Sequence, residues 1–259
     1  MDVVIVGAGN IAHCYGQLLK LHGHQIVQVM SRDAAHATRL GEVLNARWST
    51  DLADINMDAD AYILAVSDAA LPVLNDTLRL GKRIVAHTAG AAPLSVISKI
   101  STHTGVMYPL QSIRKELKNY PPIPVLLEAS NEETLRRIQQ LAQSIASQTA
   151  VVDSRQRLQL HLSAVLVNNF TNHLMALAKS YCEREGLDFS LLAPIIRETF
   201  ERLEKHAPEQ VQTGPALRHD EATMALHRDL LEQEPHLRLM YQVMSDSIQD
   251  FYARQQADA

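Results

Sequence analysis

Short apolar runs alternate with segments of helical spacing in the first part of the chain. The apolar runs have the length of β-strands and lie at residues 3–6, 26–30, 61–66, 83–86, 105–108, 125–128 and 149–152. Helical spacing is found at residues 33–44, 69–80 and 132–146, and Ser130 or Asn131 can cap the last of these helices. Strands that alternate with helices predict an α/β domain with a Rossmann-type, mostly parallel, doubly wound sheet.

The pattern changes near Asp153. From residue 155 to residue 254 apolar residues recur at helical spacing, with breaks at Gly186, Pro208 and Pro235. We therefore expect a nucleotide-binding Rossmann-like domain over residues 1–153 and an all-α domain for substrate binding and dimerisation over residues 154–259. Residues 155–184 are expected to form a long apolar helix, which either builds a homodimer interface or is buried within its own domain.

Composition narrows the function classes. The 259 residues carry a net charge of −5, which provides no positive field for nucleic acid or anionic membranes. No apolar run approaches the roughly 20 residues that a membrane helix needs, and Met1 and Asp2 lead directly into the first strand without room for a signal peptide. Cys14 and Cys182 are the only cysteines, which suits a reducing cytoplasm, and neither a zinc-type cysteine pair nor a His-Glu-x-x-His pattern predicts a metal.

A glycine turn joins the first strand to a helical pattern. Gly7-Ala8-Gly9-Asn10-Ile11-Ala12 follows the run 3–6 directly. Gly7 allows a tight turn, Gly9 lets the backbone approach a pyrophosphate, and Ala12 lets the helix pack close to the strand. The free N–H groups at the helix N-terminus then face the phosphates. This strand–turn–helix context predicts dinucleotide binding by residues 7–11.

The end of the second strand indicates which nicotinamide cofactor is bound. Ser31 and Arg32 come first, and a hydroxyl with a guanidinium suits the 2′-phosphate of NADP. Asp33 then begins the next helix. In the alternative interpretation Arg32 is only solvated and Asp33 binds the ribose hydroxyls of NAD. The residues favour NADP.

Three further loops fall at the same carboxyl edge of the predicted sheet. Ala65, Val66 and Ser67 end one strand, His87 begins the loop after the next, and Tyr108 begins the loop after a third. Ligands of doubly wound folds bind in the crevice at this edge. We expect residues 65–67 and His87 to contact the cofactor, although His87 could instead hydrogen-bond its own turn.

Candidates for proton transfer lie in the last of these loops and in the long helix. Hydride transfer needs a proton donor or acceptor near the reacting carbon. Tyr108 could donate a proton or only shape the site. His161 and Asn169 are eight residues apart, so they can share a helix face. The two side chains could equally form hydrogen bonds across a helix contact, and for His173 that second interpretation is favoured.

These motifs resemble a known family. Gly7–Ala12, His87–Gly90, Tyr108–Ser112 and His161–Val165 with Asn169 are similar to segments of two-domain bacterial proteins named as candidate NADP oxidoreductases. Those proteins pair a Rossmann-like domain with a helical domain of unknown function, and their layout is similar to pyrroline-5-carboxylate reductases and β-hydroxyacid dehydrogenases. The resemblance implies the fold and the cofactor class, and it leaves the substrate open.

Two departures affect the chemistry. In β-hydroxyacid dehydrogenases a lysine precedes an asparagine by four residues, and the match puts Val165 on the lysine and Asn169 on the asparagine. In prephenate dehydrogenases a His-Pro pair occupies the place of Tyr108-Pro109. The general acid of the first family is therefore absent here, and the histidine of the second is replaced by tyrosine, so neither chemistry transfers directly.

The sequence leaves three hypotheses. The first is an NADP-dependent oxidoreductase that acts on a small carboxylate-bearing metabolite, such as an imine, a keto acid or a hydroxy acid; Arg218, near a Gly-Pro turn, could bind the carboxylate or lie solvated beside a capping Asp220. The second is a dinucleotide-binding sensor or partner-binding protein without turnover. The third is a protein that binds a flavin or an adenylate. Ser31 and Arg32 argue against this hypothesis.

Overall fold

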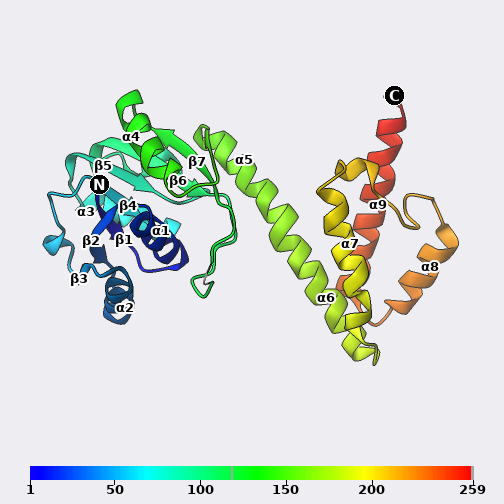
Figure 1. The fold of residues 1–259 in the computed structure, drawn as a ribbon. Helices are drawn as coiled ribbons and strands as arrows, with labels where there is room; N and C mark the ends of the chain where they lie inside the picture. Colours follow the sequence, from blue (N-terminus) through cyan, green and yellow to red (C-terminus); the bar gives the residue numbers. More distant parts are fainter. Residues whose placement is uncertain (118, 258–259) are drawn as a thin grey trace. The chain divides into compact units, whose positions relative to one another are not determined.

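The computed structural model describes residues 1–117 and 119–257 (Figure 1). The chain forms two compact units, Met1–Phe170 and Thr171–Ala259. The first holds a β-sheet with its helices, and the second is helical. The division falls 17 residues after the expected boundary at Asp153, because the first helix after that residue is anchored on the sheet. Where the functional domains divide stays a prediction.

The first unit is built on an eight-stranded sheet in the order β3-β2-β1-β4-β5-β6-β7-β8. The strands are β1 (Asp2–Val6), β2 (Gln25–Met30), β3 (Arg47–Ser49), β4 (Ala61–Leu64), β5 (Gly81–His87), β6 (Ser101–Pro109), β7 (Pro124–Ala129) and β8 (Gln148–Val151). All neighbours are parallel except β6 and β7. The order β3-β2-β1-β4-β5-β6 is that of dinucleotide-binding folds, so the predicted fold class is confirmed.

Each face of the sheet is covered by its own helices. The helices and short 3-10 turns of this unit are α1 (Asn10–Leu21), α2 (Ala34–Leu44), η1 (Leu52–Asp54), η2 (Asp68–Ala70), α3 (Leu71–Thr77), η3 (Leu94–Ile97) and α4 (Glu132–Gln143). Val3 and Ile5 pack in one core with α1, α2 and α4, whereas Val4 and Val6 pack in another with α3 and η3. Alternate residues of a strand face opposite sides, so one apolar run supplies both cores.

Helix ends follow the capping residues that the sequence offers. The Asp33 carboxylate accepts the His36 N–H and caps α2, as expected. Of the two caps weighed for α4, the structure uses Asn131, which accepts the Thr134 N–H. The predictions did not include β3 or the antiparallel direction of β7. The three residues of β3 are too short and polar for an apolar run, and an apolar run carries no information about strand direction.

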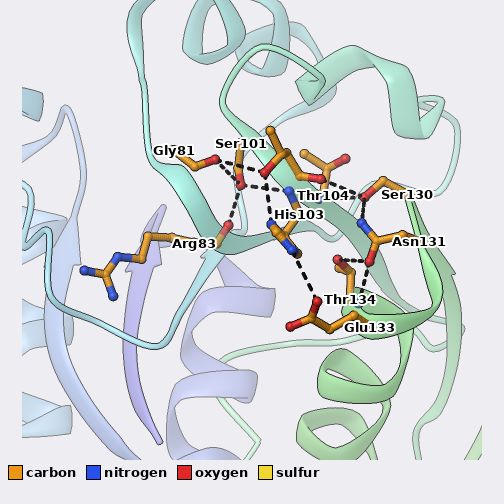
Figure 2. Close-up of polar contacts among 10 residues, drawn as sticks. Gly81, Arg83, Ser101, His103, Thr104, Ser130, Asn131, Glu133 and Thr134 are labelled. Atoms are coloured by element: carbon orange, nitrogen blue, oxygen red, sulfur yellow. Dashed lines mark hydrogen bonds and ion pairs between the residues drawn. The ribbon is translucent and has the colours of Figure 1, made fainter.

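A polar network ties β5, β6 and α4 together at the edge of the sheet opposite the glycine turn (Figure 2). The Ser101 hydroxyl lies 3.1 Å from the Gly81 carbonyl oxygen and 2.5 Å from that of Arg83, and it accepts the His103 N–H. The register of β5 against β6 shifts between Gly81 and Ile84. The hydroxyl therefore satisfies backbone groups that the irregular ladder leaves unpaired, and His103 continues the network to Glu133 at 3.8 Å.

The predicted long helix is present but not uniform. It consists of α5 (Ser154–Ala164), a π-helical segment (Val165–Phe170) and α6 (Thr171–Arg184). Asp153 and Gln156 form a capping box at the start of α5. Leu162, Val167 and Phe170 are exposed, so the apolar side of this helix is not covered within the chain.

The second unit is a set of helices with little buried surface. It contains α6, η5 (Phe189–Leu192), α7 (Ala193–Leu203), η6 (Pro208–Gln210), α8 (Glu221–Leu230) and α9 (Pro235–Ala257). Ala216, Met224 and Leu231 are buried. Large exposed apolar side chains include Leu191, Ile195, Leu226, Leu230, Leu239 and Val243. Within residues 1–117 and 119–257, no helix has both the length and the apolar character that crossing a bilayer requires.

Candidate functional site

Gly7 forms the turn that ends β1. Its φ of +118° lies where side chains are rarely tolerated, and its N–H donates to the Met30 carbonyl at 2.7 Å. A Cβ atom on Gly7 would lie 2.0 Å from the Ala65 carbonyl oxygen. Glycine is therefore required here, because β1 and β4 approach each other at the point where the chain turns away from the sheet.

Gly9 serves a different purpose. It is the N-cap of α1, with φ near −85°, and a Cβ atom placed on it would meet no atom within 4 Å. The space that this Cβ would enter lies above the free N–H groups at the start of α1, where a pyrophosphate is stabilised by the helix dipole. Asn10 and Ile11 supply the first of those N–H groups.

A cavity of about 550 Å³ opens at this turn. Eight of the eleven residues predicted to bind cofactor line it: Gly7, Ala8, Gly9, Ser31, Arg32, Ala65, Val66 and Ser67. Asn10, Ile11 and His87 do not. The cavity wall also includes Asp33, which the sequence analysis gave as the alternative ligand of an NAD ribose. It further includes His36, Thr50, Leu52 and Lys115, which the sequence had not indicated as cofactor ligands.

Arg32, Asp33 and His36 line the end of the cavity at β2, and the Asp33 carboxylate accepts the His36 N–H at 2.9 Å. This hydrogen bond lowers the pKa of Asp33. The Ser31 hydroxyl accepts the Asp33 N–H at 3.3 Å. Asp33 thus begins the helix, as expected, and the Arg32 guanidinium is left without an ion-pair partner among the described residues.

The predicted loops follow one another along the carboxyl edge of the sheet. Because β2, β1, β4, β5 and β6 are neighbours in that order, Arg32, the glycine turn, residues 65–67, His87 and Tyr108 come in the same order across the edge. An extended dinucleotide that begins at Arg32 and crosses the glycine turn would end beside β4 and β5.

Tyr108 and His161 are in direct contact. The Tyr108 hydroxyl lies 2.9 Å from His161 Nδ1, and the two rings meet edge to face with centroids 5.8 Å apart. Gly90, in the loop after β5, packs against both: a Cβ atom there would lie 2.9 Å from His161 Nδ1 and from Tyr108 Cζ. Both side chains were candidate catalytic groups, and the structure joins them as a pair.

A buried ion pair holds His161 in position. Arg157 lies one turn before His161 on α5 and is only 1% exposed, and its guanidinium binds the Glu128 carboxylate of β7 and the Ala92 carbonyl. The Ser154 hydroxyl donates to the same carboxylate at 2.9 Å. These contacts fix the first turns of α5 against the sheet, and the next turn carries His161 to Tyr108.

Burial shifts the pKa values of Tyr108 and of His87, which ends the neighbouring strand β5, in opposite directions. Burial raises the pKa of Tyr108, as does the nearby charge of Asp68, and Arg157 opposes them. Burial also lowers the pKa of His87 to about 4, with a further contribution from Arg157. His87 is therefore neutral at neutral pH. Its Nδ1 accepts the Ala89 N–H at 3.2 Å, so it takes the turn-stabilising role that the sequence analysis left open.

The remaining candidates are not brought to this pair. Asn169 lies in the π-helical segment and is exposed, so whether it lines one wall together with His161 stays a prediction. Val165 begins that segment, and His173 is exposed on α6. Arg218 is exposed and Asp220 caps α8. Within residues 1–117 and 119–257, no cluster of three metal-ligating side chains is found.

Family models match both parts of the chain, although the boundary between them falls just before β7, inside the first compact unit. Residues 1–111 match the Rossmann-like domain, and residues 123–248 match a domain of unknown function, DUF2520. No curated protein matches the chain.

Solved structures are similar over almost the whole chain. A candidate NADP oxidoreductase from Bacteroides fragilis is 34% identical, with a TM-score of 0.87 over 96% of this chain and 98% of its own. A protein from Thermotoga maritima is 21% identical, with a TM-score of 0.75 over 98% and 99% of the two chains. A reductive aminase from Aspergillus terreus, solved with NADPH and ethyl-5-oxohexanoate, is 15% identical, with a TM-score of 0.71 over 95% and 92%.

Proposed function

The chain belongs to the family of two-domain candidate NADP oxidoreductases in which a Rossmann-like domain precedes a DUF2520 domain, and from this premise we propose that it transfers a hydride between NADP and a small carboxylate-bearing metabolite. One observation carries the proposal. The cavity starts at Arg32, crosses the glycine turn and reaches residues 65–67, and the Tyr108–His161 pair follows two strands farther along the same edge.

The residues present fit NADP. Arg32 offers a guanidinium to the 2′-phosphate, the start of α1 offers N–H groups to the pyrophosphate, and Gly9 leaves the space that the pyrophosphate needs. Residues 65–67 form the wall beside the nicotinamide. NADP supplies the hydride, or accepts it, when bound.

Proton transfer is assigned to Tyr108 and His161. In the reducing direction the Tyr108 hydroxyl donates its proton to the oxygen or nitrogen of the substrate. The Nδ1–H tautomer of His161, 2.9 Å away, replaces that proton while its Nε2 takes one from solvent. Burial raises the pKa of Tyr108 and so disfavours the tyrosinate that donation would leave, which makes this replacement necessary. Asn169, in the π-helical segment that follows α5, is kept as a candidate that orients the substrate.

A dinucleotide-binding protein without turnover is the second candidate function. Val165 stands where the resembled dehydrogenases have a lysine, which is the one observation that favours it. Addition of imines or keto acids to the NADPH complex separates the two functions. If the protein is an oxidoreductase, at least one of these compounds oxidises the bound NADPH and its fluorescence falls. If the protein is a sensor, the fluorescence stays unchanged with every compound.

Selectivity for NADPH tests the cofactor assignment. Trp48 is the only tryptophan, and it lies in β3 just before Thr50 and Leu52 of the cavity wall, so energy transfer from Trp48 to reduced nicotinamide reports binding. We expect the protein to prefer NADPH to NADH. Replacing Arg32 with Glu should weaken NADPH at least about tenfold, because a charged contact to the 2′-phosphate becomes a repulsion, and should affect NADH little.

The matched control is Arg47→Glu. Arg47 lies in β3, outside the cavity wall, so this charge reversal should leave both affinities unchanged. Equal losses for NADPH and NADH in the Arg32 variant would contradict the role given to Arg32. The absence of binding of either dinucleotide to the unaltered protein would contradict the proposed function.

A homodimer formed through the helical unit is the expected assembly. Leu191 is 76% exposed, and Ile195, Leu226, Leu230 and Leu239 are more than 60% exposed. Monomeric proteins rarely leave so many large apolar side chains in water, and a second copy would cover them. Sedimentation velocity at micromolar concentration should give a dimer, and a monomer at all concentrations would contradict this.

The free Cys14 and Cys182 support a cytoplasmic location.

A further inference from the structure

Lys115 reaches the cofactor cavity from a part of the chain that no motif indicates. It follows β6 in the segment 110–117, and its side chain lines the same cavity as Arg32 and His36. Its N–H donates to the Asn10 side-chain oxygen at 3.4 Å, at the first residue of α1. Ile113, two residues earlier, is buried in the core. The segment is thus held just before Lys115 by the burial of Ile113 and at Lys115 by its backbone hydrogen bond to Asn10.

Lys115 and Arg32 line one cavity and, among the described residues, take part in no ion pair. His13, on the second turn of α1, has its pKa lowered first by burial and then by the charges of Lys115, Arg39 and His36, whereas Glu116 opposes them. An anion bound between Lys115 and Arg32 would offset the repulsion between the two cations.

We propose that Lys115 is a specificity-determining residue that binds the 2′-phosphate of NADP together with Arg32, an inference that rests on the proposed function. The guanidinium comes from the end of β2, and the ammonium comes from the segment after β6, so the two cations reach the phosphate from different elements. A 2′-phosphate is a dianion near neutral pH and can accept hydrogen bonds from both.

The 2′-phosphate suits Lys115 better than the pyrophosphate does. The pyrophosphate already receives the N–H groups and dipole of α1. Lys115 instead shares the cavity wall with Arg32 and with His36 of α2, at the end of β2 where the 2′-phosphate would lie.

Replacing Lys115 with Gln tests the assignment in the full-length protein. Affinities for NADPH, NADH and the fragment 2′,5′-ADP are measured by calorimetry. We expect NADPH and 2′,5′-ADP to bind about 10- to 100-fold more weakly, because one charged hydrogen bond to the phosphate is lost, while NADH binding changes less than about threefold. The dependence of NADPH affinity on salt should also become less steep.

Arg114→Gln is the matched control. Arg114 precedes Lys115, is exposed, and lies 3.9 Å from Glu116 without lining the cavity, so its loss should leave all three affinities unchanged. If the Lys115 substitution lowers the affinities for NADPH and NADH equally, Lys115 binds the pyrophosphate that both share, and the proposal is overturned. Unchanged NADPH affinity would overturn it as well. If the unaltered protein binds none of the three probes, the proposed function itself fails.

Discussion

Replacement of Gly7 by Ala is expected to lower the free energy of unfolding by about 3–5 kcal/mol, as the sum of a strained backbone and a steric clash. The new Cβ would lie 2.0 Å from the Ala65 carbonyl oxygen, and φ at this residue is +118°. Relief requires β1 and β4 to separate at the turn. Urea unfolding of the full-length protein followed by circular dichroism measures the loss. An unfolding midpoint equal to that of the unaltered protein would show that the turn can relax.

Two other glycines separate the causes. Gly23 has φ of +84° but open space around a would-be Cβ, so Gly23→Ala should lose only about 1–2 kcal/mol from backbone strain. Gly9 has an ordinary φ and open space, so Gly9→Ala should keep its stability. The methyl group of the new alanine would enter the space assigned to the pyrophosphate, so the affinities for NADPH and NADH should fall together.

Removal of the buried Arg157 guanidinium should also cost about 3–5 kcal/mol, because it leaves the Glu128 carboxylate without its counter-ion. Arg157 is 1% exposed, and its charge is satisfied by Glu128 and by the Ala92 carbonyl. Arg157→Met keeps much of the side-chain volume and removes the charge. The loss should appear in urea unfolding as a lower midpoint, since α5 is then less firmly held on the sheet.

The double variant Arg157→Met with Glu128→Leu identifies the origin of that loss. If the cost is mainly that of an unpaired buried charge, the double variant should be more stable than Arg157→Met alone, because no charge remains to be paired. Losses that simply add would mean instead that packing and the Ala92 contact dominate. As a surface control, Lys179→Met breaks the exposed pair with Glu183 and should change stability by less than about 1 kcal/mol.

Local chemistry explains which parts of the site could be predicted. Gly7 and Gly9 follow an apolar run, and Asp33 precedes a helical pattern, so a few neighbouring residues determine their roles. Lys115 and Arg157 depend on contacts with Asn10 and Glu128, which are 105 and 29 residues away. The spacing of apolar residues within a short stretch of sequence carries no information about contacts between residues so far apart. Tyr108 and His161 were each predicted, but their pairing depends on how α5 is anchored.

The face of the long helix was predicted from an ideal period, and the π-helical segment breaks that period. Residues 165–170 contain no proline or glycine that would mark an interruption. The prediction that Asn169 shares a face with His161 assumed a regular α-helix throughout, and the wider π-helical turn changes the angle per residue between them. A rule based on regular helices cannot detect such a local widening.

The sheet ends on each side in a very short strand, β3 with three residues and β8 with four. An outer strand presents N–H and C=O groups that another chain could pair with, and long outer strands therefore promote aggregation. Here β3 and β8 pair with their inner neighbours over only three and four residues, and Arg47 and Gln148 add polar side chains to them. Such short borders give another chain little backbone to pair with, which disfavours cross-strand polymerisation.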